Sequence, residues 1–298
     1  MACLLFCLVL TIVIQKTEEQ NPESGMRIGG EILSNIAYSD DTSIMGIEQK
    51  LTQKFLNGFS KNASEVGLKI NIDKTKCLAI SKKERKLDIN LGEKKLEQET
   101  EFEYLGFKIS SSGDQEKAVK HRIGKGWEVF GKFKSTLTSR NVTLLTKRRI
   151  YETYIKSVVL YGMENVTWTK ALLTRMEVFQ NHILRFMMGK TMLDKIPCSE
   201  LRERTEIGSI SDTIQKRVLS WEEKIIKSSK GVAEICYNGV VDGKRGRGRP
   251  TRRWIDNIKE WKEPKSTYDD STSKVDTKGI SRQYITRSNT ITVQNVQA

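Results

Sequence analysis

Residues 36–45 read Ile36-Ala37-Tyr38-Ser39-Asp40-Asp41-Thr42-Ser43-Ile44-Met45. Two short β-prone runs meet here at a polar point, a pattern that predicts a β-hairpin. Asp40 and Asp41 suit the turn, because Asp tolerates turn geometry and bonds its own backbone. Two adjacent carboxylates repel each other unless a cation lies between them, and oxygen ligands of this kind suit Mg²⁺. The stretch therefore predicts a divalent-metal site at the tip of a hairpin, with ordinary turn residues as the alternative.

The chain as a whole is basic. Its 298 residues include 51 Lys and Arg against 37 Asp and Glu, which gives a formal net charge of +14. Such an excess indicates a polyanionic partner, of which nucleic acid is the usual one and an anionic membrane surface the alternative. The hydrophobic fraction of 37% is enough for a core, and the length allows one large domain or two ordinary ones.

Five cysteines are scattered along the chain, and the two histidines stand alone. No C-x-x-C pair occurs, which argues against a disulfide scaffold and against a zinc site. Free thiols of this kind are typical of an intracellular protein. We therefore expect an intracellular chain, with a nuclear location left open.

The N-terminal run Met1–Ile14 is almost entirely apolar. It looks like the core of a signal peptide, yet no basic residue precedes it and no small-residue cleavage pattern follows it. It is also too short to cross a bilayer comfortably. The residues themselves leave a targeting segment and a buried helix equally open.

Apolar periodicity predicts further elements along the chain. Apolar residues at helical spacing, with Gly67, Thr143, Thr169 and Gly189 as caps or stops, predict amphipathic helices. These helices are expected at 47–65, 118–138, 143–161, 170–188, 198–204, 211–228 and 254–261. The β-prone runs are expected to form a strand at 77–81, a hairpin at 87–96 and a strand at 102–109. The mixture predicts an α+β fold.

Three stretches follow one another in order: Tyr38–Asp41, then Gly67–Asn71 with Lys74–Lys76, then Phe102–Phe107. They resemble motifs C, D and E of the reverse transcriptases of non-LTR retrotransposons, and the whole resemblance covers residues 1–190. Three motifs in order are more specific than any one of them. The resemblance implies an RNA-directed DNA polymerase domain of an endonuclease-reverse transcriptase. Its fold would be a partial palm of antiparallel strands and helices, followed by an all-helical thumb.

The resemblance also implies roles for particular residues. Asp40 and Asp41 match the catalytic carboxylates that hold Mg²⁺ or Mn²⁺ in the family. Contacts with nucleic acid are implied for Lys69, Lys74, Lys76, Tyr104 and Gly106. The expected partners are an RNA template and a DNA primer or duplex, with deoxynucleoside triphosphates as the small-molecule substrate. The alternatives are a solvated basic turn for the lysines and a plain strand for Tyr104 and Gly106.

Two parts of the family pattern are not found in this sequence. In the family an upstream strand carries a third catalytic aspartate, and the fingers bind the template. The residues before Asp40 supply neither, so we expect a fragment that is inactive alone and binds metal weakly or not at all. Met1–Leu10 resembles the palm helix that precedes the hairpin in the family. The resemblance thus favours a buried helix over a signal peptide and disfavours membrane association.

The C-terminal part is first basic and then polar. Lys244–Arg253 carries Arg245, Arg247 and Arg249 in a Gly-Arg-Pro context that resembles an AT-hook. Extended arginines of an AT-hook fit the narrow minor groove of A·T-rich DNA. A nonspecific basic linker or a nuclear-localisation patch is the alternative. Beyond Glu263 the apolar periodicity is lost, which predicts disorder.

These features predict the organisation of the chain. In order, we expect a partial palm at 1–113, a thumb-like helical domain at 114–190, a helical connector at 191–243, a basic nucleic-acid-binding segment at 244–262 and a disordered tail at 263–298. Three functions remain open. The first is a reverse-transcriptase fragment of a retrotransposon. The second is a non-catalytic nucleic-acid-binding protein that uses the thumb helices and the Arg-Gly-Pro-rich segment, and the third is a membrane-targeted chain led by Met1–Ile14.

Overall fold

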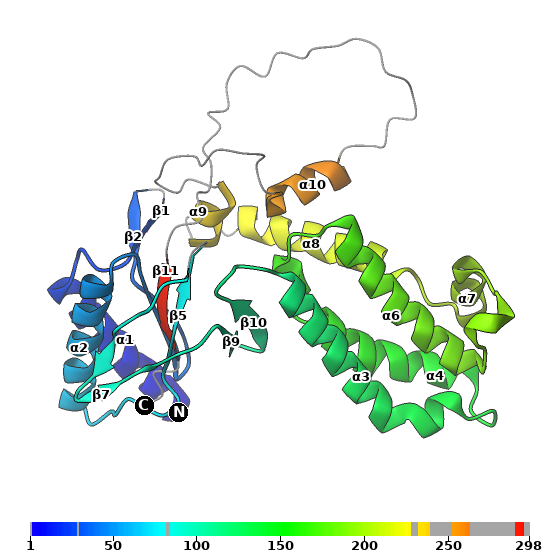
Figure 1. The fold of residues 1–298 in the computed structure, drawn as a ribbon, viewed down its shortest axis with the longest axis horizontal. Helices are drawn as coiled ribbons and strands as arrows, with labels where there is room; N and C mark the ends of the chain where they lie inside the picture. The colour runs from blue at the N-terminus through cyan, green and yellow to red at the C-terminus, as the bar shows by residue number, and fades with distance from the viewer. Residues whose placement is uncertain are drawn as a thin grey trace, which may run out of the picture. The chain divides into compact units, whose positions relative to one another are not determined.

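The computed structural model describes residues 2–28, 30–81, 84–227, 232–238, 252–262 and 290–294 (Figure 1). Two compact units divide the chain. The first comprises Met1–Asp114, Ser229–Gly248 and Val275–Ala298, and the second comprises Gln115–Ser228 and Arg249–Lys274. The first unit combines a sheet with helices and the second is helical, so the predicted α+β class is confirmed.

The main sheet of the first unit has five strands in the order β3-β4-β11-β5-β8. Its strands are β3 (Asn35–Tyr38), β4 (Asp41–Gly46), β5 (Lys76–Ile80), β8 (Glu97–Gln98) and β11 (Thr290–Gln294). Neighbouring strands run antiparallel, except that β5 and β8 are parallel. Three small hairpins accompany the sheet: β1–β2 (Met26–Ile28 and Glu31–Leu33), β6–β7 (Asn90–Leu91 and Lys94–Lys95) and β9–β10 (Glu101–Tyr104 and Phe107–Ser110).

Two helices, α1 (Ala2–Gln20) and α2 (Gln49–Glu65), share one hydrophobic core with the sheet (Figure 1). Phe55 and Phe59, one turn apart on α2, are each 1% exposed and pack with Ile44 of β4. The predicted apolar spacing of this helix is therefore confirmed. Gly67 follows the helix with φ of +82°, a left-handed conformation that glycine adopts at little cost.

Helix α1 is buried on one side only, so the prediction of a buried helix is half wrong. Leu10 and Val13 are 5% and 2% exposed, whereas Leu4, Leu8 and Ile12 are 54–66% exposed. The run is apolar all round, and periodicity therefore could not show which side would pack. Among the described residues, no helix is both long enough and apolar enough to cross a membrane.

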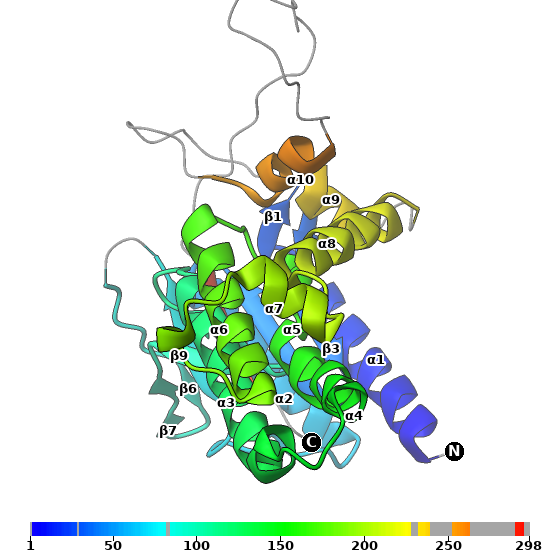
Figure 2. The same cartoon turned by 90° about the vertical axis from the view of Figure 1, so that its right-hand side faces the viewer.

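The second unit is built from helices around its own core (Figure 2). They are α3 (Glu116–Thr138), α4 (Leu144–Ile150), a π-helical turn (Tyr151–Lys156), α5 (Ser157–Leu160), α6 (Lys170–Met188), α7 (Cys198–Thr205), α8 (Ile210–Lys227) and α10 (Trp254–Lys262). Short 3₁₀ turns lie at Met163–Asn165 and Met192–Asp194. The π-helical turn joins α4 to α5, so the predicted helix at 143–161 is one continuous rod with a single irregular turn.

The ends of α6 follow from the sequence. Thr169 lies before the helix, and its hydroxyl accepts a hydrogen bond from the Leu172 N–H at 3.3 Å. Gly189 closes the helix with φ of +63°. The predicted cap and stop are both confirmed.

Gly126 lets α3 approach α5 and α6, since a Cβ there would collide with Val159 and Phe179.

The predicted disordered tail needs a correction at five residues. Thr290–Gln294 form β11, which lies between β4 and β5 in the main sheet. Four of these five residues are β-branched, which favours a strand once partner strands are available on both sides. Helix α9 (Val232–Asn238) lies in the stretch expected to be a connector. The remainder of the expected tail lies outside the described residues.

Candidate functional site

The β3–β4 hairpin presents the two aspartates in different ways. Tyr38 pairs with Asp41, which leaves Ser39 and Asp40 as the two turn residues. Ser39 has φ of +56°, as a tight hairpin turn requires. Asp40 is exposed at the tip, whereas Asp41 is the first residue of β4 and is partly buried. The predicted hairpin is therefore present, but Asp41 lies in the strand and not in the turn.

The surroundings of Asp41 disfavour the ionised form of its carboxyl group. Burial, and then the neighbouring charge of Asp40, raise the pKa of the Asp41 carboxyl above its ordinary value. Its Oδ1 atom is shielded from solvent and accepts no hydrogen bond within the described chain. A partly buried carboxylate beside a second carboxylate is stabilised by a cation, so the pair has the chemistry of a metal ligand.

The β9–β10 hairpin carries the second group of candidates. Its two turn residues are Leu105 and Gly106, with φ of +46° and +75°, between Tyr104 and Phe107. Two successive positive φ angles are the signature of a type I′ turn, which explains why Gly106 is needed there. The alternation at 102–109 predicted one strand, whereas the resemblance of Phe102–Phe107 to motif E implied a hairpin, and the structure has the hairpin.

Tyr104 is coupled to Asp41. Burial raises the pKa of the Tyr104 hydroxyl, and the negative charge of Asp41 raises it further. The two side chains are therefore close enough for their charges to interact. The hydroxyl is shielded from solvent and has no hydrogen-bond partner in the part of the chain that the structure describes. The fold thus places the Tyr104 hydroxyl within reach of the negative charge of Asp41.

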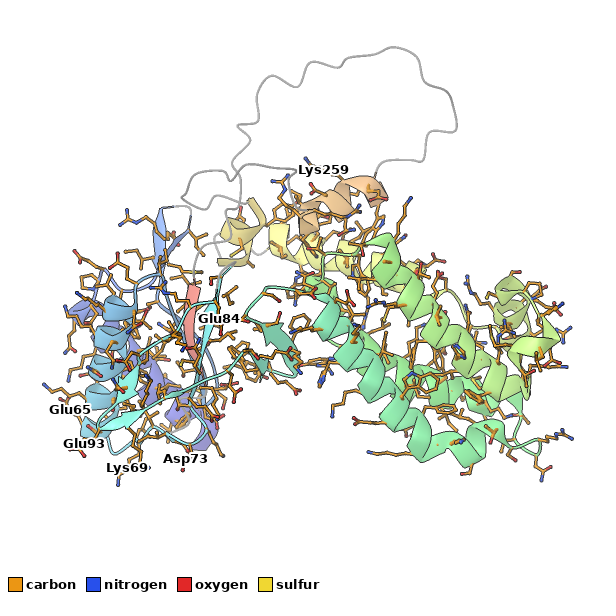
Figure 3. The ribbon with its side chains drawn as sticks, viewed as in Figure 1. Glu65, Lys69, Asp73, Glu84, Glu93 and Lys259 are labelled. Carbon is orange, nitrogen blue, oxygen red and sulfur yellow. The ribbon has the colours of Figure 1, made fainter. Side chains whose placement is uncertain are left out.

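The three candidate lysines do not form one group. Lys76 pairs with Glu97, and more loosely with Glu99 at 3.6 Å, and the hydrogen bond to Glu97 raises the pKa of Lys76. This ammonium group thus has carboxylate partners, and its contact with nucleic acid stays a prediction. Lys69 is exposed, and Figure 3 shows it at the end of the first unit that carries Asp73, apart from the β9–β10 hairpin.

Lys74 lies in a turn that its own neighbours hold. Its backbone N–H donates to Asn71 Oδ1 at 3.2 Å. The Thr75 hydroxyl donates to the Asn71 carbonyl oxygen at 2.7 Å. These bonds explain why the Lys-Thr-Lys stretch forms a defined turn before β5. The Lys74 side chain is exposed, and its contact with nucleic acid stays a prediction.

No third metal ligand joins the aspartate pair within the described ranges. No cluster of three or more His, Cys, Asp or Glu side chains with a metal-binding arrangement occurs there. Asp40 and Asp41 thus offer oxygen donors that suit Mg²⁺ or Mn²⁺, but only as a pair.

The basic segment at 244–262 divides into two parts. Arg245, Arg247 and Arg249 lie outside the described residues. The part from Arg252 onward is engaged in the second unit: Arg252 pairs with Glu260, and Arg253 pairs with Asp256 at 3.3 Å. Arg252 and Arg253 thus have acidic partners on α10, and the binding of nucleic acid by this segment stays a prediction.

Asn257 fixes helix α10 to the rest of the second unit through hydrogen bonds to the Trp168 backbone. This residue was not identified from the sequence. It is 1% exposed, and its side chain accepts from the Trp168 N–H at 2.9 Å and donates to the Trp168 carbonyl oxygen at 2.8 Å. Trp254 adds a bond from its indole N–H to the Glu164 carbonyl oxygen at 2.7 Å. The only sequence signal was the amphipathic pattern of Trp254–Lys262, which indicates a helix but not its binding place.

Thr42 is a second residue that sequence reasoning missed. It follows Asp41 in β4, is 0% exposed, and its hydroxyl finds no hydrogen-bond partner among the described residues. Its position directly after the aspartate pair was the available signal. Unsatisfied polar atoms on two successive residues indicate that this end of β4 is not optimised for stability alone.

Comparison with known proteins gives a similarity to a transposon-derived protein. No protein-family model matches the chain. The chain is 25% identical over 252 residues to a putative uncharacterized transposon-derived protein of Caenorhabditis elegans, an alignment that covers 79% of this chain and 87% of the worm protein. The similarity extends through both units and supports a transposon-related origin for the chain.

Proposed function

We propose that this chain derives from the reverse transcriptase of a retrotransposon, with Asp40 and Asp41 as the remnant of its metal-binding site. The observation that carries the proposal is the aspartate pair at the tip of the β3–β4 hairpin, where Asp41 Oδ1 is shielded from solvent and has no hydrogen-bond partner among the described residues. Asp41, on the hairpin that resembles motif C, acts electrostatically on Tyr104, on the hairpin that resembles motif E, and the Tyr104 hydroxyl also has no hydrogen-bond partner among the described residues. The similarity to a transposon-derived protein supports the same origin.

The chemistry follows from the two carboxylates. In nucleotidyl transfer, divalent cations clamp the attacking and leaving oxygens of the phosphoryl group. Asp41 would bind such a cation through its unpaired Oδ1, and Asp40 would add the second oxygen donor from the turn. Cation binding would offset both the burial and the charge of Asp40, which together raise the pKa of Asp41. Because two carboxylates hold Mg²⁺ weakly without substrate phosphates, we expect little or no nucleotide addition by this chain.

The first test measures metal binding. Titration with Mn²⁺, followed by its water-proton relaxation, compares the wild-type chain with Asp41→Asn and with Asp73→Asn as the matched control. Asp73 is an exposed carboxylate that precedes β5 and has no neighbouring aspartate (Figure 3). The proposal predicts weak binding that Asp41→Asn abolishes and Asp73→Asn leaves intact. Equal binding by all three chains contradicts it.

The second test is primer extension on an RNA template with Mg²⁺, using the same three chains. No extension by any of them agrees with a remnant site. Extension that only Asp41→Asn abolishes retains the assignment of the hairpin but refutes the expected inactivity, since a further ligand must then complete the site. Extension that survives Asp41→Asn refutes the role given to the hairpin.

Non-catalytic binding of nucleic acid is a second candidate function, and the surface of the second unit favours it. Lys132 and Lys134 near the end of α3, Arg140 in the following loop and Arg149 on α4 are all exposed. No ion pair is found for these four within the described residues. Free cations of this kind are suited to phosphate contacts, whose affinity falls steeply with salt.

A salt titration tests this second candidate. Fluorescence anisotropy of a labelled RNA or DNA duplex gives the affinity at several KCl concentrations. Lys134→Ala is expected to reduce the slope of log affinity against log salt by about 1. Lys120→Ala is the matched control, because Lys120 already pairs with Glu116 at 2.7 Å. Equal slopes for both variants and the wild type contradict the assignment.

A further inference from the structure

Strand β11 occupies an unusual position in the main sheet. It lies between β4 and β5 although it comes from the far end of the chain. On one side Ile291, Thr292 and Val293 pair with Gly46, Met45 and Ile44. On the other side all five residues of β11 pair with β5, from Thr290 opposite Ile80 to Gln294 opposite Lys76. Both edges of the strand are therefore hydrogen-bonded.

The sheet would have a gap without this strand. Adjacent strands lie about 4.8 Å apart, so β4 and β5 on either side of β11 are separated by about 10 Å. Both are antiparallel to β11, which makes them parallel to each other. Each would then expose a row of unpaired N–H and C=O groups, and an unpaired strand edge readily accepts another strand.

The walls of this gap belong to the core of the first unit. Ile44 on β4 and Cys77 and Leu78 on β5 are each 0% exposed. Ile44 and Cys77 belong to the hydrophobic cluster that contains Phe55 and Phe59 of α2. Ile44 of β4 and Cys77 of β5 thus belong to the same core as α2. The two strands that border the gap, β4 and β5, come from the N-terminal part of the chain, whereas β11, which fills it, comes from residues 290–294.

We propose that β4 and β5 form an acceptor site for one antiparallel strand, and that Thr290–Gln294 is its exchangeable occupant. The same segment from a second copy of the chain fits the site equally well. Its hydrogen bonds to β4 and β5 do not require that it belong to the same chain. Addition of a strand to a sheet gives affinity through main-chain hydrogen bonds. Exchange of an identical element between copies is a low-cost route to association.

The direct experiment uses the full chain with Thr292→Pro and a labelled synthetic peptide of residues 288–296. Thr292 lies in the middle of both ladders, opposite Met45 and Leu78, and proline is not accommodated in a central strand. Fluorescence anisotropy is expected to show at least ten-fold tighter peptide binding by Thr292→Pro than by the wild type. Thr292→Val, which retains the strand, is expected to bind as the wild type does. A peptide of the same composition in scrambled order is the probe control.

Three results of the peptide-binding experiment would overturn the proposal. Equal binding by the wild type and Thr292→Pro, or binding of the scrambled peptide, overturns the proposal. Failure of a folded Thr292→Pro chain to bind the peptide overturns it as well. Folding of this variant is verified by slowed amide exchange in α1 and α2, the helices that form the core of the first unit.

A second measurement needs no variant and remains decisive if Thr292→Pro does not fold. Native-state hydrogen exchange of the wild type follows the amides of β11 together with those of Ile44–Gly46 and Lys76–Ile80. The proposal predicts that these amides open as one group before the amides of α2. Exchange of β11 only when α2 also opens means that the strand is a fixed part of the sheet, and the proposal fails.

Discussion

Removal of the Tyr104 hydroxyl is expected to stabilise the first unit. The hydroxyl is shielded from solvent, has no hydrogen-bond partner among the described residues, and lies within the field of Asp41. A buried polar group without a partner costs about 1–3 kcal/mol. Tyr104 is only partly buried, so we take the lower end of that range. Tyr104→Phe retains the ring and should raise the free energy of unfolding by about 1 kcal/mol.

The assay must report on the first unit alone. All tryptophans of the chain, at positions 127, 168, 221, 254 and 261, belong to the second unit, so intrinsic fluorescence does not follow the first. Hydrogen exchange of β4 and β5 amides, measured at increasing urea, gives the opening free energy of the relevant sheet. Tyr38→Phe is the matched control. Tyr38 is 65% exposed on the neighbouring hairpin, and its substitution should change stability by less than about 0.5 kcal/mol.

Two results refute this reasoning. Loss of stability in Tyr104→Phe means that the hydroxyl has a partner that stabilises the fold. An equal gain in Tyr38→Phe means that the effect comes from a generic change in hydrophobicity and not from the coupling to Asp41. A gain confined to Tyr104→Phe identifies this hydroxyl as a group retained at a cost in stability, as functional groups often are.

Two further predictions concern a charge and a buried amide. Because the folded-state pKa of Asp41 is raised, its ionisation destabilises the fold as pH rises through that pKa, and Asp41→Asn should be more stable than the wild type at pH 7. This advantage should shrink as the pH falls from the raised folded-state pKa towards the ordinary aspartate pKa of about 3.9 and be lost below it, and a pH-independent difference in hydrogen exchange of β4 contradicts it. Asn257→Ala leaves the Trp168 N–H and carbonyl oxygen without their partners, which should cost the second unit about 2–4 kcal/mol in urea unfolding followed by tryptophan fluorescence. Lys259→Ala on the exposed side of α10 (Figure 3) is the control, expected within about 0.5 kcal/mol of the wild type, and equal effects of the two substitutions refute the docking of α10 through Asn257.

Local features of the fold were predictable because local chemistry determines them. Thr169 and Gly189 delimit α6 through a hydroxyl that accepts a backbone N–H and a glycine that tolerates positive φ. The two β-prone runs around Asp40 could only meet in a tight turn. The apolar spacing of Phe55 and Phe59 fixed the buried side of α2. Each of these depends on residues within one or two turns of each other.

The candidate site was predictable only in part. The sequence indicated Asp40 and Asp41 as a pair and Tyr104 as a separate residue. It did not show that Asp41 is partly buried or that its charge affects Tyr104. It also did not show that Lys76 pairs with Glu97 and Glu99. Desolvation and ion pairing depend on neighbours that are remote in sequence, and no local pattern contains them.

By itself the sequence determined the basic charge, the helices and their caps, the position of the aspartate hairpin and the α+β class. Only the tertiary structure decided which side of α1 is exposed, where α10 docks, and that Thr290–Gln294 lies between β4 and β5. Periodicity and capping residues indicate which conformation a segment of the backbone adopts by itself. The choice of partner depends on which surfaces remain unpaired after each segment has formed, and a strand of four β-branched residues can pair only where such edges exist.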